Sequence, residues 1–269
     1  IGAVTLPFLI LLTGSRGAML SLIVFGAVLL SFSKRKLGTL LLVCLAALIA
    51  LPFLPANLKQ RFGNMRFLTD TETIRQADSS AEQRFVILQI AATVARDHLA
   101  HGVGIGNYPY ANKQYAGTRA EWAIADSYKD AHNTYLTIAA EAGAPGFVLM
   151  AGAAGSLLLA LLRAHREGIR LAPRVRDAAL AEALINRPPA FLAGTMAFLT
   201  AGLFGSLFYI IFPFLFAVST YGVTQATLVR ARREAGDNSV AAAPVRARLG
   251  GRTRSGFAGR LGAGRPRVA

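Results

Sequence analysis

The sequence predicts an all-α, polytopic helical membrane protein with about six transmembrane helices and one large loop that contains helices of its own. Of its 269 residues, 54% are hydrophobic and only 16% are charged, which is not the composition of a soluble protein. Long apolar runs recur along the chain, and the positive charges gather in a few short segments. The single cysteine, Cys44, excludes an internal disulfide and a cysteine-rich zinc module.

The apolar runs predict membrane spans, because a helix needs roughly 20 residues to cross a hydrocarbon core of about 30 Å. Residues 1–55 are predicted to hold three transmembrane helices, the first of them truncated, and residues 143–229 another three. The last apolar run is roughly twice as long as one crossing needs, and Pro213 lies near its middle, so we predict a tight helical hairpin from Pro188 to Val229. The chain begins at Ile1 without a charged leader, and we expect it to be the C-terminal part of a longer protein.

The charges assign a side to each loop, because short cytoplasmic loops are enriched in Lys and Arg. Lys34 to Lys36, the loop 163–187 and the tail 230–269 carry nearly all of the net charge of +15. The long loop 56–142 holds nine cations and nine anions, which predicts that it lies on the opposite, outer side. The tail is rich in Arg, Ala and Gly, and we expect it to be disordered and to bind anionic lipids rather than nucleic acid.

A loop as long as 56–142 usually has a function or a structure of its own. Ser79 and Ser80 are predicted to provide the N-cap of a helix that continues to Gly102. Its predicted apolar stripe has helical spacing and consists of Phe85, Leu88, Ala92, Ala95 and Leu99. A second short helix is predicted from Ala131 to Glu141, before the glycine that precedes the next span.

The run Gly102-Val103-Gly104-Ile105-Gly106 does not fit a nucleotide-binding loop, because a helix precedes it where a strand is needed. We interpret it as a turn in which glycines allow close backbone approach. A metal site built from His98, His101 and His132 is not predicted either, because their spacing matches no zinc pattern.

Three residues are candidates for a role in substrate binding or catalysis. Arg16 lies between two apolar segments, where a cation is costly unless it is paired or faces water, although it could also reach the outer head groups or cap a helix. Arg84, placed in the first turn of the predicted loop helix, would be disfavoured there unless it served an anionic partner or paired with Glu82. His132 could act as a general base, since an imidazole titrates near neutral pH, or it could simply cap a helix.

Three ordered motifs surround the large loop. They are Thr13-Gly14-Ser15-Arg16-Gly17-Ala18, then Gly102-Val103-Gly104-Ile105-Gly106-Asn107-Tyr108, and finally Ala131-His132-Asn133-Thr134-Tyr135-Leu136 followed by Glu141-Ala142-Gly143-Ala144-Pro145-Gly146. Together they resemble the motifs of the O-antigen ligase and O-antigen polymerase superfamily of bacterial inner-membrane proteins. The resemblance covers roughly residues 13 to 146.

This resemblance implies a GT-C-like, multi-pass inner-membrane glycosyltransferase whose large loop and active site face the periplasm. Its donor would be a glycan on a polyprenyl diphosphate, normally undecaprenyl diphosphate, and transfer would invert the anomeric centre without a metal or other cofactor. The acceptor would be the lipid A-core in a ligase, a second lipid-linked unit in a polymerase, or a Ser or Thr hydroxyl in a protein O-oligosaccharyltransferase.

Carried over by motif, Arg16 and Arg84 would hold the diphosphate and His132 would serve the acceptor hydroxyl. Asn107, Tyr108 and Asn133 are further candidates for contacts with the glycan. The loop aromatics, which are Tyr108, Tyr110, Tyr115 and Trp122, could stack on sugars or form an interfacial belt. Asp126, Asp130 and Glu141 are alternative bases, although we interpret Glu141 as structural.

A transporter or flippase of lipid-linked sugars is the alternative from another class. Such proteins place charges at mid-bilayer between broken, repeated helices. The predicted spans carry no charge in their interiors and the sequence has no internal repeat, so the sequence favours the glycosyltransferase.

Overall fold

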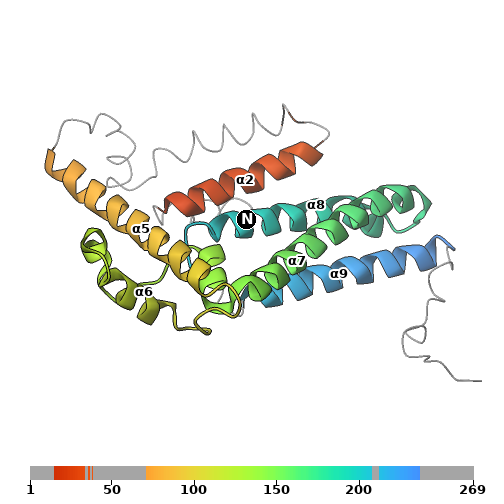
Figure 1. Ribbon diagram of the computed structural model, residues 1–269. Helices are drawn as coiled ribbons and strands as arrows, with labels where there is room; N and C mark the ends of the chain where they lie inside the picture. The colour runs from red at the N-terminus through yellow and green to blue at the C-terminus, as the bar shows by residue number, and fades with distance from the viewer. Residues whose placement is uncertain (1–14, 34–35, 37, 39–70, 208–211, 237–269) are drawn as a thin grey trace, which may run out of the picture.

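The computed structural model describes residues 15–33, 36, 38, 71–207 and 212–236. Within these residues the chain forms helices and turns and no strand, which confirms the all-α prediction. Four long helices form a bundle (Figure 1), namely α2 (Arg16–Phe32), α7 (Thr134–Leu171), α8 (Ala178–Ala201) and α9 (Phe212–Glu234). At one end of the bundle lies a second group, which we call the loop unit, formed by α5 (Thr71–Asp97), α6 (Tyr108–Ala116) and the 3₁₀ helix η3 (Ala120–Ala125).

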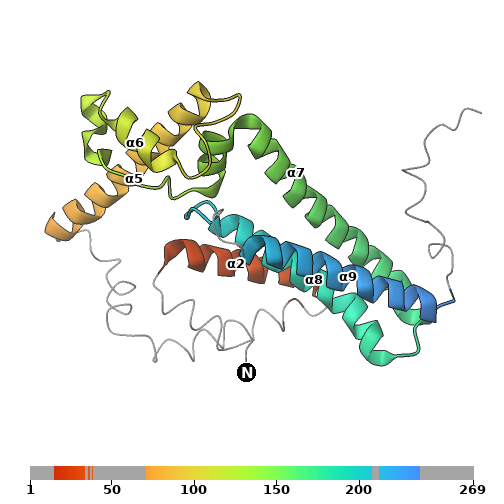
Figure 2. The same cartoon turned by 90° about the horizontal axis from the view of Figure 1, so that it is seen from below.

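Helices α2, α7 and α9 run in one direction along the bundle, and α8 runs in the opposite direction (Figures 1 and 2). Helix α8 ends beside the loop unit, where α2 and α7 begin (Figures 1 and 2). At the far end, the rings of Phe32 and His165 pack edge to face with 4.9 Å between their centroids. There Arg232 also donates two hydrogen bonds to the carboxylate of Glu167, at 2.6 and 2.7 Å. The cation-rich ends of α7 and α9 therefore meet away from the loop unit.

Helices α8 and α9 contact each other, and α9 begins one residue before Pro213. That they form a transmembrane hairpin stays a prediction. The prediction that the loop between α7 and α8 extends over 163–187 is wrong. Helix α7 continues to Leu171, and α8 begins at Ala178, well before Pro188. Helix α8 can start this early because the carboxylate of Asp177 accepts hydrogen bonds from two backbone N–H groups of its first turn, at 2.9 and 3.3 Å.

One helix in the described part of the chain, Thr134–Arg174, is long and apolar enough to cross a membrane, with a mean hydropathy of 2.0. The apolar stretch Gly17–Phe32 is shorter. The spans predicted within residues 1–13 and 37–55 lie outside the described residues, as does nearly all of the basic tail. The number of six crossings therefore stays a prediction.

Two predictions about α5 are wrong. The helix begins at Thr71, so Ser79 and Ser80 lie inside it and do not cap it. The predicted stripe does not form the buried face either, because Phe85 and Leu99 are 61% and 58% exposed. Among the described side chains of α5, the buried hydrophobic ones are Val86, Ile87, Ile90, Ala91, Val94 and Ala95, and of these only Ala95 belongs to the predicted stripe. Both sets have helical spacing, and the packing of α6 and η3 on α5 decides which of them is buried.

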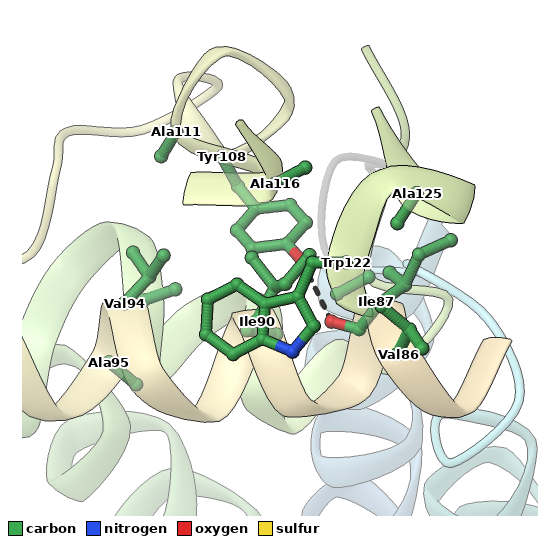
Figure 3. Packing of buried hydrophobic residues seen from close by; sticks show 13 residues of the cluster. Val86, Ile87, Ile90, Val94, Ala95, Tyr108, Ala111, Ala116, Trp122 and Ala125 are labelled. Atoms are coloured by element: carbon green, nitrogen blue, oxygen red, sulfur yellow. Dashed lines mark hydrogen bonds between the residues drawn. The ribbon is translucent and has the colours of Figure 1, made fainter. Parts of the chain in front are cut away.

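Tyr108 is the centre of the loop unit. Its side chain is fully buried, and Figure 3 shows it with Trp122 on the buried face of α5. The Tyr108 hydroxyl donates to the carbonyl of Ile87 at 3.1 Å and lies 3.2 Å from Oδ1 of Asn112. The amide of Asn112 donates in turn to the carbonyl of Ala125 at 3.0 Å. Three helices are thus tied together through two polar side chains inside an apolar core.

The glycine-rich turn attaches the loop unit to α7 by direct backbone contact. Val103 N–H donates to the Ala140 carbonyl at 2.9 Å, and Gly104 N–H to the Glu141 carbonyl at 3.0 Å. On the α7 side, Gly143 interrupts the helix with φ 64° and ψ −167°. Gly102 has φ +70°, and a Cβ there would collide with the Glu141 backbone. The interpretation of this run as a close-approach turn is therefore confirmed.

This contact predicts different costs for two alanine substitutions. Gly102 and Gly106 both have a left-handed backbone, with φ +70° and +81°, but only Gly102 faces another backbone segment at close range. We expect Gly106→Ala to cost about 1 kcal/mol through strain alone. Gly102→Ala should cost about 3 kcal/mol or more, because the α7 backbone must also move. Apparent melting temperatures of the detergent-purified variants measure the difference, and equal losses would contradict the backbone contact.

Candidate active site

A pocket of about 380 Å³ lies where α5 meets the segment that leads into α7. Its lining consists of Gln83, Arg84 and Ile87 from α5 together with Tyr128, Lys129, Asp130 and His132. Two of the residues predicted from sequence, Arg84 and His132, thus share one site although they lie far apart in the chain. The pocket combines cations, a carboxylate and an imidazole, which are the groups needed to bind an anion and transfer a proton.

Arg84 presents an exposed side chain at this pocket. It lies in the middle of α5, so the prediction that placed it in a first helical turn is wrong, because the helix begins at Thr71. No ion pair within the described residues involves Arg84, and its expected alternative partner, Glu82, does not pair with it. The guanidinium is therefore positioned to bind an anion that enters the pocket.

The opposite wall is held against α5 by Gln83. Its side-chain amide donates to the carbonyl of Ile124 at 2.7 Å, and its oxygen accepts a hydrogen bond from Lys129 Nζ at 2.7 Å. Lys129 thus provides a second cation at the pocket, and Asp130 provides the carboxylate. Burial raises the pKa of the Tyr108 phenol, and the negative charge of Asp130 raises it further.

His132 has a left-handed backbone with φ 49°, which is uncommon for a residue other than glycine. It lies between Ala131, which is buried, and Asn133, which caps α7. The left-handed turn at this position leaves the imidazole exposed at the pocket. Strained backbone of this kind costs about 1–3 kcal/mol and is concentrated at functional sites, so it supports a role for His132 beyond packing.

A short turn, residues 202–207, fixes the start of α7. Thr134 Oγ1 donates to the carbonyl of Gly205 at 2.6 Å and accepts from the backbone N–H of Leu207 at 2.9 Å. Asn133 Oδ1 accepts from the first N–H groups of α7 at 3.0 and 3.1 Å, and its amide contacts the carbonyl of Leu203 at 3.4 Å. The Asn133 side chain is thus occupied by capping, although we had predicted a contact with the glycan.

The same turn contacts the start of α2. A Cβ on Gly17 would lie only 2.6 Å from Cβ of Phe204, so this end of α2 packs tightly against the turn. Arg16 is the first residue of α2, and its side chain lies outside what the structure describes. The backbone of Arg16 is therefore next to the segment that holds Asn133, the neighbour of His132. Two helix N-termini, with their partial positive charge, converge on this turn.

Asn107, Tyr108 and Glu141, which are also candidates from the sequence, do not line the pocket. Asn107 is exposed, and its amide donates to the carbonyl of Val103 at 3.2 Å within the glycine-rich turn. Tyr108 is buried, so the structure corrects the prediction that its side chain could contact a glycan. Glu141 is 1% exposed, and its Oε1 accepts from the backbone N–H of Tyr108 at 3.0 Å, which agrees with the structural role we assigned to it.

Sequence reasoning missed Gln83, Tyr128 and Lys129. One signal was available for two of them, because Tyr128 and Lys129 lie within four residues of His132 in the polar segment Tyr-Lys-Asp-Ala-His. Gln83 carried no comparable signal. Its importance follows from hydrogen bonds to residues about 40 positions away.

A family model described as O-antigen ligase matches residues 1–151, which is more than half of the chain. The matched region includes α2, the loop unit and the first part of α7, and therefore every residue that lines the pocket. A search of curated proteins found no match to the chain.

The left-handed backbone of His132 yields a stability prediction that separates strain from chemistry. Glycine adopts φ 49° without steric cost, whereas alanine does not. We expect His132→Gly to be about 1 kcal/mol more stable than His132→Ala, although both variants lack the imidazole. Thermal unfolding of the two purified proteins provides the comparison. An alanine variant as stable as the glycine variant would show that the position is not strained.

Proposed function

The chain belongs to the O-antigen ligase family, whose members are bacterial membrane proteins, and on that premise we propose that it transfers a glycan from a polyprenyl diphosphate to an acceptor hydroxyl. The donor carrier is undecaprenyl diphosphate, and the reaction takes place at the periplasmic face of the inner membrane. The observation that carries this proposal is the shared pocket of Arg84 and His132. The basic tail, 230–269, lies at the cytoplasmic surface and contacts anionic lipids.

The reaction forms a bond between the acceptor oxygen and C1 of the sugar, while the bond from C1 to the diphosphate oxygen breaks. The polyprenyl diphosphate leaves with the electron pair of that bond, and the acceptor hydroxyl loses its proton to a base. Inversion at C1 requires attack from the face opposite the diphosphate. Negative charge grows on the leaving group in the transition state, so its stabilisation is the main catalytic task.

Arg84 is the residue best suited to this task. A guanidinium is permanently charged and donates two parallel hydrogen bonds to phosphate oxygens. Lys129, in the same pocket, adds a second positive charge. Arg16, the first residue of α2, is the third cation that we propose for the diphosphate, on the basis of its sequence motif. Hydrogen-bond donors that are already in place for a developing negative charge often lower the free energy of the transition state by about 3 to 4 kcal/mol each.

His132 receives the proton of the acceptor hydroxyl. A positioned general base contributes about 10²- to 10⁴-fold to a rate. Asp130 is the alternative base, because its carboxylate lines the same pocket. Neither base needs a metal, so the proposed mechanism uses only side chains of this chain and no cofactor.

The acceptor is the lipid A-core oligosaccharide in the ligase form of this proposal. In the polymerase form it is a second lipid-linked unit, and in a protein O-oligosaccharyltransferase it is a Ser or Thr hydroxyl. Deletion of the gene distinguishes these forms and the flippase alternative. Long glycans accumulating on the carrier indicate a ligase, single units indicate a polymerase, and units trapped on the cytoplasmic leaflet indicate a flippase. Normal carrier pools with loss of glycan from proteins alone indicate a protein transferase.

Substitutions in the pocket test the assignment of roles. We expect Arg84→Ala to lower the transfer rate about 10²- to 10³-fold, because a donor to the leaving diphosphate is lost. Arg84→Lys should retain part of the activity, since it keeps the charge but not the paired hydrogen bonds. His132→Ala should lower the rate no more than Arg84→Ala does, because the leaving group is already good. Transfer from lipid-linked donor in membranes is the measurement.

Arg96→Ala is the matched control for this series. Arg96 lies on the same helix, its side chain is 81% exposed, and it is absent from the pocket lining. Its loss should leave transfer unchanged. Retained activity in Arg84→Ala, or equal losses in Arg84→Ala and Arg96→Ala, would contradict the assignment of the diphosphate to this pocket.

A further inference from the structure

Two exposed tyrosines form a pair at the edge of the pocket. Tyr110 on α6 and Tyr128 before α7 have ring centroids 5.3 Å apart with an interplanar angle of 69°. Their side chains are 65% and 61% exposed, in contrast to the buried Tyr108 and Trp122 of the same unit. Nζ of Lys113 lies 4.6 Å from the centroid of the Tyr128 ring. Because Tyr128 also lines the pocket, the pair extends that site onto the surface of α6.

We propose that Tyr110, Tyr128 and Lys113 form a subsite that binds a sugar ring of the acceptor glycan. This inference rests on the proposed function and adds to it the residues that recognise the acceptor. A pyranose ring has an apolar C–H face and a polar rim, which match an exposed aromatic ring and a neighbouring ammonium group. The cation near the Tyr128 ring also limits the motion of that side chain, so less entropy is lost on binding.

The surroundings of the pair favour a glycan over a lipid surface. A membrane-inserting patch needs contiguous apolar side chains. Exposed polar or charged residues lie on both chain segments instead, including Gln114 beside Lys113 and Asp126 before Tyr128. The two tyrosines therefore offer an amphipathic surface within a polar environment, which suits a hydrated polyhydroxylated ligand.

The position of Tyr128 favours the acceptor over the donor. Tyr128 and His132 belong to one segment and form the same wall of the pocket, whereas Arg84 lies on the α5 wall. In the proposed mechanism His132 serves the acceptor hydroxyl and Arg84 binds the leaving diphosphate. A sugar stacked on Tyr128 is thus on the acceptor side of the reacting bond.

The experiment measures transfer by the full chain in lipid nanodiscs, with acceptor concentration varied at saturating lipid-linked donor. The acceptor probe is lipid A-core isolated from a strain that lacks surface polysaccharide. We expect Tyr110→Ala and Tyr128→Ala each to raise the acceptor KM about fivefold to tenfold with little change in kcat, as the loss of one aromatic contact predicts. Tyr110→Phe and Tyr128→Phe should restore the KM, because the ring is retained. Ile105→Ala, an equally exposed apolar residue outside the pocket, is the control and should change nothing.

A binding measurement separates this inference from the proposed function. Core oligosaccharide released from lipid A by mild acid should show saturation-transfer NMR contacts with the Arg84→Ala protein in the absence of donor, although transfer by this variant is greatly slowed. Adding Tyr128→Ala to that protein should remove the contacts. An unchanged acceptor KM in both alanine variants overturns the subsite even if Arg84 and His132 are essential. A rise in the donor KM of these variants instead overturns the assignment of the subsite to the acceptor. Loss of binding in Ile105→Ala overturns the localisation of the subsite at the tyrosine pair.

Discussion

The backbone contact between the glycine-rich turn and the break in α7 is the constraint on which the candidate site depends. Arg84 belongs to the loop unit, whereas His132 leads into α7, so their distance is set by how the unit is attached to that helix. The attachment consists of main-chain hydrogen bonds between residues 103–104 and 140–141, with a further bond from Ala144 N–H to the Leu99 carbonyl at 2.7 Å. Main-chain contacts of this kind leave no rotamer freedom, and they need Gly102 and Gly143 because a Cβ at either position would collide with backbone.

A second attachment fixes the other side of the site. The turn 202–207 follows α8 and receives hydrogen bonds from Thr134 and Asn133, while Gly17 of α2 packs against Phe204 in the same turn. The starts of α2 and α7 therefore both contact this short turn, which lies at the loop-unit end of the bundle. This arrangement brings the backbone of Arg16 and the segment that holds His132 to the same end of the bundle, although more than a hundred residues separate them.

The positions of helices and turns could be predicted from the sequence better than the side of each helix that is buried. The helical character could be predicted from the long apolar runs, and the turn at Gly102 and the break at Gly143 because glycine permits a left-handed backbone that other residues rarely adopt. The buried face of α5 could not, since Phe85 and Leu99 fit helical spacing as well as Ile87 and Ile90 do, and only the packing of α6 and η3 distinguishes them. The same limit explains the pocket. A motif identified His132, and the place of Arg84 on the helix before the glycine-rich turn identified Arg84. Gln83 and Lys129 matter through contacts between distant segments, which no local sequence pattern predicts.

The charges that line the pocket also make the proposed anionic substrate compatible with a loop that has no net charge. Cations and anions balance over residues 56–142 as a whole, but they are not mixed evenly in space. Arg84 and Lys129 face the pocket, and Asp130 is the single carboxylate in its lining. Because interactions with charges beyond about 10 Å are largely screened at physiological salt, a diphosphate in the pocket responds to these neighbours rather than to the neutral total. Asp130 offsets one of these two positive charges, so the pocket keeps a net attraction for an anion, while the left-handed backbone at His132 leaves the imidazole exposed at the same pocket.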